Sequence, residues 1–235
     1  MVRRPGRLRP DRRRVDARLA ADAAAAPAGG DRGAVFADDG RLGPVRERLA
    51  WYPDDPWLWQ LAAQWRRIAQ EESFAGRAAE RGDELGSRLV TARLARDVVR
   101  LCFLLERRYA PYAKWLGTAF AELELAREVG PALEAALAAR SWPAREDGLV
   151  AALEAVARRQ VEVTPGPEPA AHAYFGRPFR VIGGDRFAEA CLARVADPAL
   201  RTLPPIGAVD QLTDSTDVLD PLRRRSLAAL YPSLR

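Results

Sequence analysis

Apolar side chains recur at helical spacing through most of the middle of the chain. After a small helix expected over residues 44–50, the first long run predicts a helix over residues 56–80, because its apolar positions follow the spacing of one helical face. Asp55 followed by Pro56 is a typical helix start, with the aspartate as N-cap and the proline at the first helical position. The apolar face consists of Trp57, Leu61, Trp65 and Ile68.

A second long helix is expected over residues 83–108, after a break at Gly82. Its residues 101–105, Leu-Cys-Phe-Leu-Leu, are apolar around the whole circumference, which is typical of a central helix. Gly130 and Pro131 are expected to end the helix that follows. The later helices are expected over residues 111–128, 131–140 and 143–160.

The C-terminal part of the chain carries weaker signals. Residues 164–177 are rich in proline and glycine and predict a linker, and residues 179–182 predict a single strand. Helices are expected over residues 185–195 and near residues 221–231. These patterns together predict a mainly α fold, a five- to six-helix bundle with a looser C-terminal segment that contains at most one or two short strands.

The net charge of +5 is concentrated at the N-terminus. Residues 1–20 hold eight arginines and two aspartates, so this segment carries +6 and the remainder carries −1. Residues 1–33 are also of low complexity and predict a disordered Arg/Ala-rich tail. We therefore divide the chain into this tail, a helical core over residues 34–163, and a linker with a C-terminal helical extension over residues 164–235.

No segment has the composition of a membrane anchor or of a targeting signal. Nowhere do 18 consecutive apolar residues occur, and Asp22 interrupts the alanine-rich stretch that follows the basic run. Cys102 and Cys191 lie far apart in apolar helical patterns, so they predict neither a disulfide framework nor a metal site. We expect a cytoplasmic protein with no membrane partner and no bound metal of its own.

Motifs of known catalytic chemistry are not found in the sequence. Nucleotidyltransferases of the polymerase-β type place a Gly-Ser turn before two acids that hold a divalent metal. Gly86-Ser87 is followed by the single acid Asp97, in a segment with helical rather than strand spacing. The phosphate-binding loop of nucleotide hydrolases and the glycine-rich dinucleotide motif are absent as well.

The most informative constellation is a set of polar side chains on the two long predicted helices. By helical angle, the charges on the second helix lie directly beside its apolar stripe, and charges next to a core must be paired or must contact a ligand. These positions are therefore candidates for ligand binding, and Lys114, the single lysine of the chain, is added to them. The candidates on the two helices are Gln64, Arg67, Glu71, Arg93, Asp97 and Arg100.

Two interpretations of this constellation remain open. The first is a structural ion network that holds the two helices together, which the general behaviour of buried charges favours. The second is a wall that faces a phosphate-bearing ligand or a partner domain, since arginine binds phosphate and carboxylate groups through two parallel hydrogen bonds.

Several longer runs resemble a bacterial family known as domain of unknown function 4037. The most specific run is residues 107–120, Arg-Arg-Tyr-Ala-Pro-Tyr-Ala-Lys-Trp-Leu-Gly-Thr-Ala-Phe. The similarity covers about residues 34–231. The other runs are residues 51–53, 64–72, 76–77, 82–88, 177–181, 207–211 and 214–217.

The resemblance implies a helical region that follows a nucleotidyltransferase-like domain, whose catalytic part is not found upstream of Trp51 here. It implies an accessory or substrate-binding domain that is not catalytic alone and has such a catalytic domain or subunit as its partner. Mg and a nucleotide would enter only with that partner. One alternative is an enzyme subunit that binds a nucleotide or a small phosphorylated ligand at the Arg/Glu face. Another is nucleic-acid binding through the Arg-rich tail.

Overall fold

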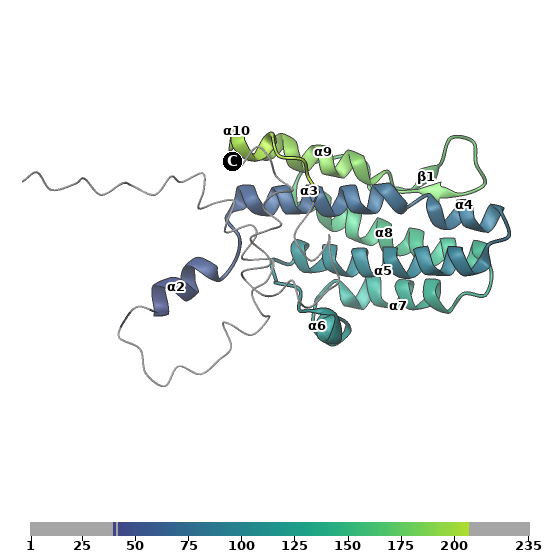
Figure 1. Ribbon diagram of the computed structural model, residues 1–235, viewed down its shortest axis with the longest axis horizontal. Helices are drawn as coiled ribbons and strands as arrows, with labels where there is room; N and C mark the ends of the chain where they lie inside the picture. The colour runs from purple at the N-terminus through teal and green to yellow at the C-terminus, as the bar shows by residue number, and fades with distance from the viewer. Residues whose placement is uncertain (1–39, 41, 207–235) are drawn as a thin grey trace, which may run out of the picture.

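The computed structural model describes residue 40 and residues 42–206, and within them the chain is mainly helical, as the sequence predicts (Figure 1). The tail over residues 1–33, the helix expected near residues 221–231 and the runs at 207–217 lie outside the described residues. The helices are α2 (Leu42–Leu49), α3 (Asp54–Glu71), α4 (Phe74–Glu80), α5 (Glu84–Leu105), the 3-10 turn η1 (Ala113–Trp115), α6 (Leu116–Phe120), α7 (Ala126–Ala138), α8 (Trp142–Val163), α9 (Gly184–Arg194) and α10 (Pro198–Arg201).

The long helices form a bundle around α3 and α5. Helix α3 packs between α9 and α5, α5 packs on α8, and α7 packs on α8 (Figure 1). Short segments cover the two ends, with α6 near the C-terminal end of α5 and α4 near its N-terminal end. No helix of the described residues is both long enough and apolar enough to cross a membrane.

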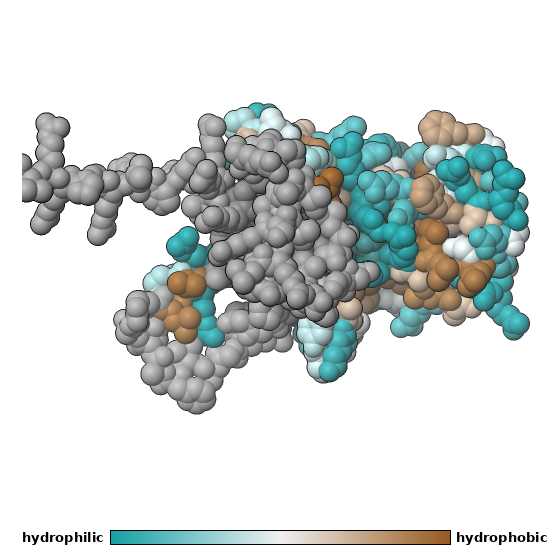
Figure 2. All heavy atoms as spheres, in the orientation of Figure 1, coloured by the Kyte–Doolittle hydropathy of each residue, from teal (hydrophilic) through white to brown (hydrophobic). Residues whose placement is uncertain are grey.

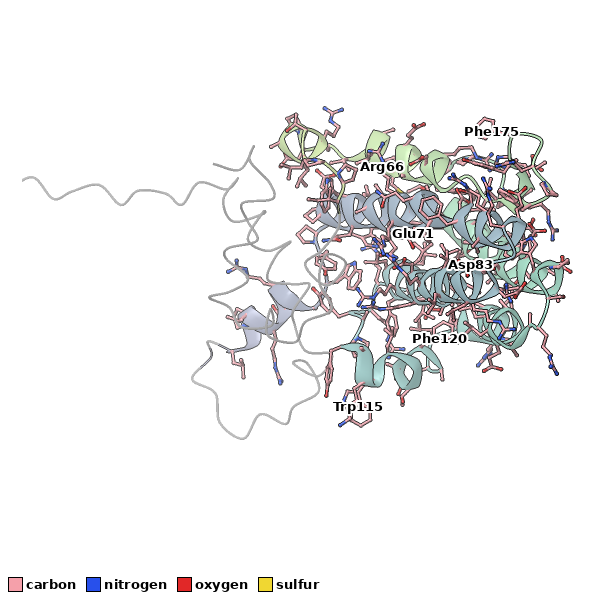
Figure 3. The ribbon with its side chains drawn as sticks, turned by 45° about the vertical axis from the view of Figure 1, so that its right-hand side comes forward. Arg66, Glu71, Asp83, Trp115, Phe120 and Phe175 are labelled. Carbon is pink, nitrogen blue, oxygen red and sulfur yellow. The ribbon has the colours of Figure 1, made fainter. Side chains whose placement is uncertain are left out.

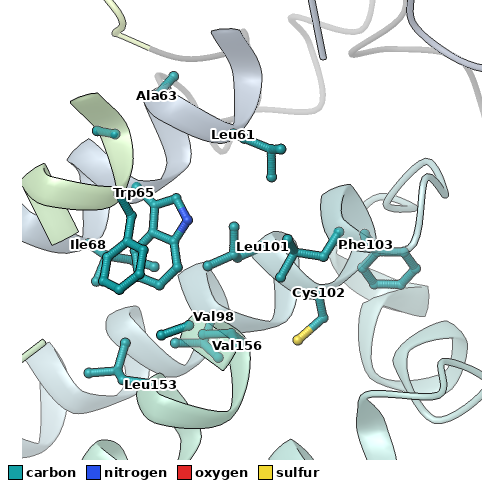
Figure 4. Packing of buried hydrophobic residues seen from close by; sticks show 14 of the residues in the cluster. Leu61, Ala63, Trp65, Ile68, Val98, Leu101, Cys102, Phe103, Leu153 and Val156 are labelled. Atoms are coloured by element: carbon teal, nitrogen blue, oxygen red, sulfur yellow. The ribbon is translucent and has the colours of Figure 1, made fainter. Parts of the chain in front are cut away.

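A polar hub lies within the apolar core. The Trp65 ring stacks on Phe187 at 4.5 Å between ring centroids. Its indole Nε1 donates to Gln160 Oε1 at 2.8 Å, and Gln160 Nε2 in turn donates to Thr164 Oγ1 at 2.7 Å. Because all of these polar atoms are paired, the hub joins α3, α8 and α9 without leaving a buried donor unsatisfied. The apolar side chains around it include Ile68, Val98, Leu101, Leu153 and Val156 (Figure 4).

The helix predicted over residues 56–80 is in fact two helices, so that expectation is wrong. Helix α3 ends at Glu71 and α4 begins at Phe74. The Glu72 carboxylate accepts hydrogen bonds from the backbone N–H groups of residues 182, 183 and 184, at 2.8, 3.0 and 3.1 Å. This contact across 110 residues lies where the two helices are divided, and helical periodicity contains no signal for it.

The second long helix is close to its predicted range but ends earlier, at Leu105. Arg107 has a left-handed backbone with φ of 54°, and Arg108 N donates to Phe103 O at 2.9 Å. This is the hydrogen bond of a Schellman C-terminal cap, usually made around a glycine. Because an arginine stands where a glycine is usual, the sequence contains no signal for this helix end.

The prediction of one helix over residues 111–128 is also wrong. This segment contains η1, the short helix α6 and a series of turns, and α7 then runs through Gly130 and Pro131 rather than ending there. The residues just before α7 are fixed by Glu106, whose carboxylate accepts from the backbone N–H groups of Glu124 and Leu125. Burial of Val129, Leu133 and Ala136 against α8 continues the helix across the proline.

A short strand lies within the segment predicted as a linker, and a second short strand follows that segment. Strand β1 (His172–Ala173) pairs antiparallel with β2 (Arg180–Val181), and the register places His172 opposite Val181. The strand expected over residues 179–182 is confirmed, and so is the helix expected over residues 185–195, which is α9. The prediction of at most one or two short strands holds for the described residues.

The close contact of α7 and α8 requires a glycine. A Cβ atom at Gly148 would lie 2.7 Å from Ala136 N and 2.8 Å from Ala132 O. We expect Gly148→Ala to destabilise the protein by about 1–3 kcal/mol in urea denaturation, because backbone atoms must move apart. The control is Gly117→Ala in α6, where a Cβ meets nothing within 4 Å, and which we expect to be neutral or stabilising by up to about 1 kcal/mol. Equal stability of the two variants would contradict this packing.

Candidate ligand-binding site

Six of the seven predicted site residues line the contact between α3 and α5. The α3 members are three or four residues apart and lie on one helical face, and the α5 members do the same. Figure 3 places Glu71 between the two helices, and Figure 2 shows hydrophilic side chains gathered over this stretch. We call this set the α3–α5 site: Gln64, Arg67 and Glu71 from α3, and Arg93, Asp97 and Arg100 from α5.

The ion pairing that the sequence favours between the two helices is present. Arg93 Nη2 lies 2.7 Å from Glu71 Oε1, and Arg67 Nη2 lies 3.5 Å from the same oxygen. Arg67 Nε lies 3.3 Å from Asp97 Oδ2. Gln64 Nε2 donates to the main-chain oxygen of Asp97 at 2.8 Å. Each of the two acids of the site therefore contacts an arginine of the opposite helix.

The acids lie deep in this site, as does Arg100, whereas Arg93 lies at its opening. The Glu71 side chain is 11% exposed and the Asp97 side chain is similarly buried, whereas the Arg93 side chain is 56% exposed. Glu71 Oε2 is buried and accepts no hydrogen bond from any of the described residues. A buried acceptor without a donor is unfavourable, so this oxygen is available to a hydrogen-bond donor from outside the described residues.

Burial also changes the acidity of Asp97. Desolvation raises the pKa of Asp97 above its ordinary value of 3.8, and the neighbouring Arg67, Arg100 and Gln64 offset this only in part. The carboxylate is therefore held at a cost to the folded state.

Lys114 lies on a different element from the other six candidates. It is exposed on η1, with its Nζ 5.0 Å from the centroid of the Trp115 ring. Trp115 Nε1 donates to the Tyr112 hydroxyl at 3.1 Å. Figure 3 shows Trp115 projecting from the η1–α6 segment, away from Glu71. We therefore describe Lys114 separately from the α3–α5 site.

Glu72 has a structural role that the sequence analysis did not predict. Its carboxylate fills the cradle of N–H groups at the start of α9, where Gly183 has a left-handed φ of 70°. Such a cradle is a common anion site, but here the protein's own carboxylate occupies it. Burial raises the pKa of Glu72, with the three backbone hydrogen bonds as a partial offset. The Gly183-Gly184 pair is the one sequence signal that could have located it.

A groove of about 620 Å³ at the end of the bundle was also missed. The guanidinium of Arg107 stacks 3.8 Å from the centroid of the Trp57 ring and pairs with Asp54 at 3.0 Å. The groove lies among residues of α3, α5, α8 and α9, so it depends on chain segments far apart in the sequence. Its other lining residues are Asp55, Leu58, Leu105, Glu106, Arg159, Val163 and Arg194.

Other acidic side chains of the bundle bind backbone N–H groups and so have structural roles. Asp55 accepts from the backbone N–H groups of Ala196 and Asp197 at 2.9 and 2.7 Å. Glu106 accepts from the backbone N–H groups of the two residues that precede α7. Within the described residues no three His, Cys, Asp or Glu side chains are grouped to hold a metal ion, so we assign none to them. Ser87 is buried within α5 and accepts from Arg145 at 2.6 Å, so Gly86-Ser87 is not a phosphate-binding turn.

The raised pKa of Asp97 predicts the pH dependence of stability. Its contribution is fully present below the unfolded pKa, near 3.8, and is lost as the pH rises through the folded pKa. We expect the difference in unfolding free energy, wild type minus Asp97→Asn, to fall as the pH is raised from about 4 to about 8 in urea denaturation. A difference that instead rises with pH would mean that Arg67 stabilises the carboxylate more than burial penalises it.

Comparison with known proteins gives one family. Neither the curated proteins nor the solved structures include a significant match to this chain. A family model matches residues 28–116, a range that contains all seven predicted site residues and ends at Leu116. The resemblance expected beyond residue 116 stays a prediction. Residues 28–116 of the chain are similar to the family described as Domain of unknown function (DUF4037).

Proposed function

We propose that this chain is a helical accessory domain that binds a small phosphorylated ligand at the α3–α5 site and is not catalytic alone. We further propose that a nucleotidyltransferase-like domain or subunit supplies the chemistry, and that Mg and a nucleotide enter with that partner. Two free, buried cysteines, Cys102 and Cys191, fit a reducing cytoplasm.

The observation that carries the proposal is the buried Glu71 Oε2, to which none of residues 42–206 donates, in a site that opens toward solvent at Arg93. A ligand hydroxyl would satisfy this oxygen, and the guanidinium groups of Arg93 and Arg67 would contact a phosphate beside it. Nucleotides and sugar phosphates carry both groups. Binding would therefore give this oxygen a hydrogen-bond donor without breaking a hydrogen bond that the oxygen already accepts.

The use of the carboxylates supports a domain that does not catalyse alone. Asp55, Glu72 and Glu106 bind backbone N–H groups, and Glu71 and Asp97 contact arginines. A general base or metal ligand must be available to the substrate. To act on a substrate, these carboxylates would first have to break the contacts they make with backbone N–H groups and arginines.

The first test is turnover. We expect the isolated chain, incubated with Mg and each of the common nucleoside triphosphates, to release no pyrophosphate above the rate without protein. Release that scales with the concentration of the chain would contradict the proposal, whereas ligand binding without turnover is what it requires.

The second test is ligand-induced stability. A ligand that binds the folded state at about 100 times its Kd stabilises it by about 2.7 kcal/mol. We expect Mg·ATP to raise the Tm of the wild type, and adenosine, which has no phosphate, to have little effect. In Arg93→Ala the response to Mg·ATP should be lost.

The matched control is Arg88→Ala. Arg88 lies on the same helix, its side chain is 54% exposed, and it contacts Glu84 at 3.9 Å, outside the α3–α5 site. This variant should respond to Mg·ATP as the wild type does. If Arg93→Ala retains the full response, or if both variants lose it equally, the α3–α5 site does not bind the phosphate.

A further inference from the structure

Apolar side chains are exposed at the end of the bundle that carries α4, the start of α5 and the β1–β2 hairpin. Phe74, Leu85, Leu89 and Phe175 are all among the large exposed apolar residues, and Phe175 is 90% exposed. Figure 2 shows hydrophobic residues gathered over this end of the molecule. An apolar cluster surrounded by polar residues commonly marks an interaction surface.

The tip of the hairpin holds Phe175 outward. Tyr174 N donates to Phe179 O at 3.0 Å and Arg177 N donates to Tyr174 O at 2.8 Å, which closes a tight turn. Phe175 and Gly176 occupy its centre with φ of 43° and 72°. A left-handed backbone is unfavourable for a bulky residue, and the exposed ring gains no burial in return (Figure 3).

The hairpin is nevertheless fixed to α4. The Phe179 side chain is buried over Gly76, where a Cβ would lie 2.6 Å from the Phe179 ring. Arg177 pairs with Glu80 at 3.6 Å. The hairpin and α4 thus form the two walls of a groove of about 380 Å³, lined by Phe74, Arg77, Ala78, Glu80, Arg81 and Arg177.

The charge of this α4–hairpin groove is unbalanced. Three arginines and one glutamate line it, and Glu80 is already paired with Arg177. Within the described residues neither Arg77 nor Arg81 has a carboxylate at ion-pair distance; the Arg77 guanidinium lies 5.6 Å from the Phe74 ring centroid. The groove is therefore complementary to negative charge at one side and to an apolar group at the other.

We propose that the α4–hairpin groove is a docking surface for an acidic protein segment that carries apolar anchor side chains. Its carboxylates contact Arg77 and Arg81, and its apolar side chains pack on Phe74 and Phe175. Aliphatic Leu85 and Leu89 beside the groove extend the apolar area in a form that suits a protein partner. Single-stranded nucleic acid fits less well, because the aliphatic side chains of Leu85 and Leu89 offer no ring on which a base could stack.

The test is fluorescence anisotropy with the full chain. The probe is a fluorescein-labelled peptide composed of Asp, Glu and Phe, compared with a peptide in which Lys replaces the acids and with labelled oligo(dT). We expect the acidic peptide to bind with an affinity that falls as salt is raised, and the lysine peptide not to bind. Arg77→Glu/Arg81→Glu should weaken binding by at least about tenfold, and Phe175→Ser should weaken it as well.

The matched control is Arg127→Glu/Arg140→Glu, a charge reversal of the same size on exposed residues of the α7 side. All substituted side chains are exposed, so circular dichroism should show an unchanged fold. The proposal is overturned if the acidic peptide does not bind, or if it binds equally well to Arg77→Glu/Arg81→Glu. Tighter binding of oligo(dT), lost in the same variant, would assign the groove to nucleic acid instead.

Discussion

The burial of α3 on most of its sides is the constraint on which the rest of the structure depends. A helix between α5 and α9 can carry polar side chains only if neighbouring elements satisfy them. Trp65 meets this condition through Gln160 of α8, and Gln64 meets it through the backbone of Asp97. These bonds fix how α3 is rotated, and therefore which of its side chains face α5.

The α3–α5 site is a consequence of that rotation. Glu71 is turned toward α5, and Arg93 and Arg67 pair with one of its oxygens. The other oxygen has no donor in the part of the chain that the structure describes. The next residue, Glu72, points to the start of α9 and binds three backbone N–H groups there. The two adjacent carboxylates thus have different roles. Glu72 attaches α9 to α3, and Glu71 has an oxygen that can accept a hydrogen bond from a ligand.

The sequence predicted the helical fold, the core faces and six of the residues that meet between α3 and α5, because these follow from spacing within single helices. It did not predict the division between α3 and α4, since the partners of Glu72 lie 110 residues further along the chain. The passage of α7 through Pro131 depends on burial against α8, and the left-handed Arg107 replaces the glycine that would have marked the end of α5. The groove beside Trp57 was missed because its lining residues come from four helices.

The central claim is that the α3–α5 site, rather than another surface of the bundle, binds the phosphorylated ligand. It is tested most directly by a crystal structure of the chain with Mg and a non-hydrolysable ATP analogue. We predict a phosphate oxygen within hydrogen-bond distance of Arg93 and a ligand hydroxyl that donates to Glu71 Oε2. An analogue bound elsewhere, for example in the groove beside Trp57, with the Arg93–Glu71 pair unchanged, would contradict it.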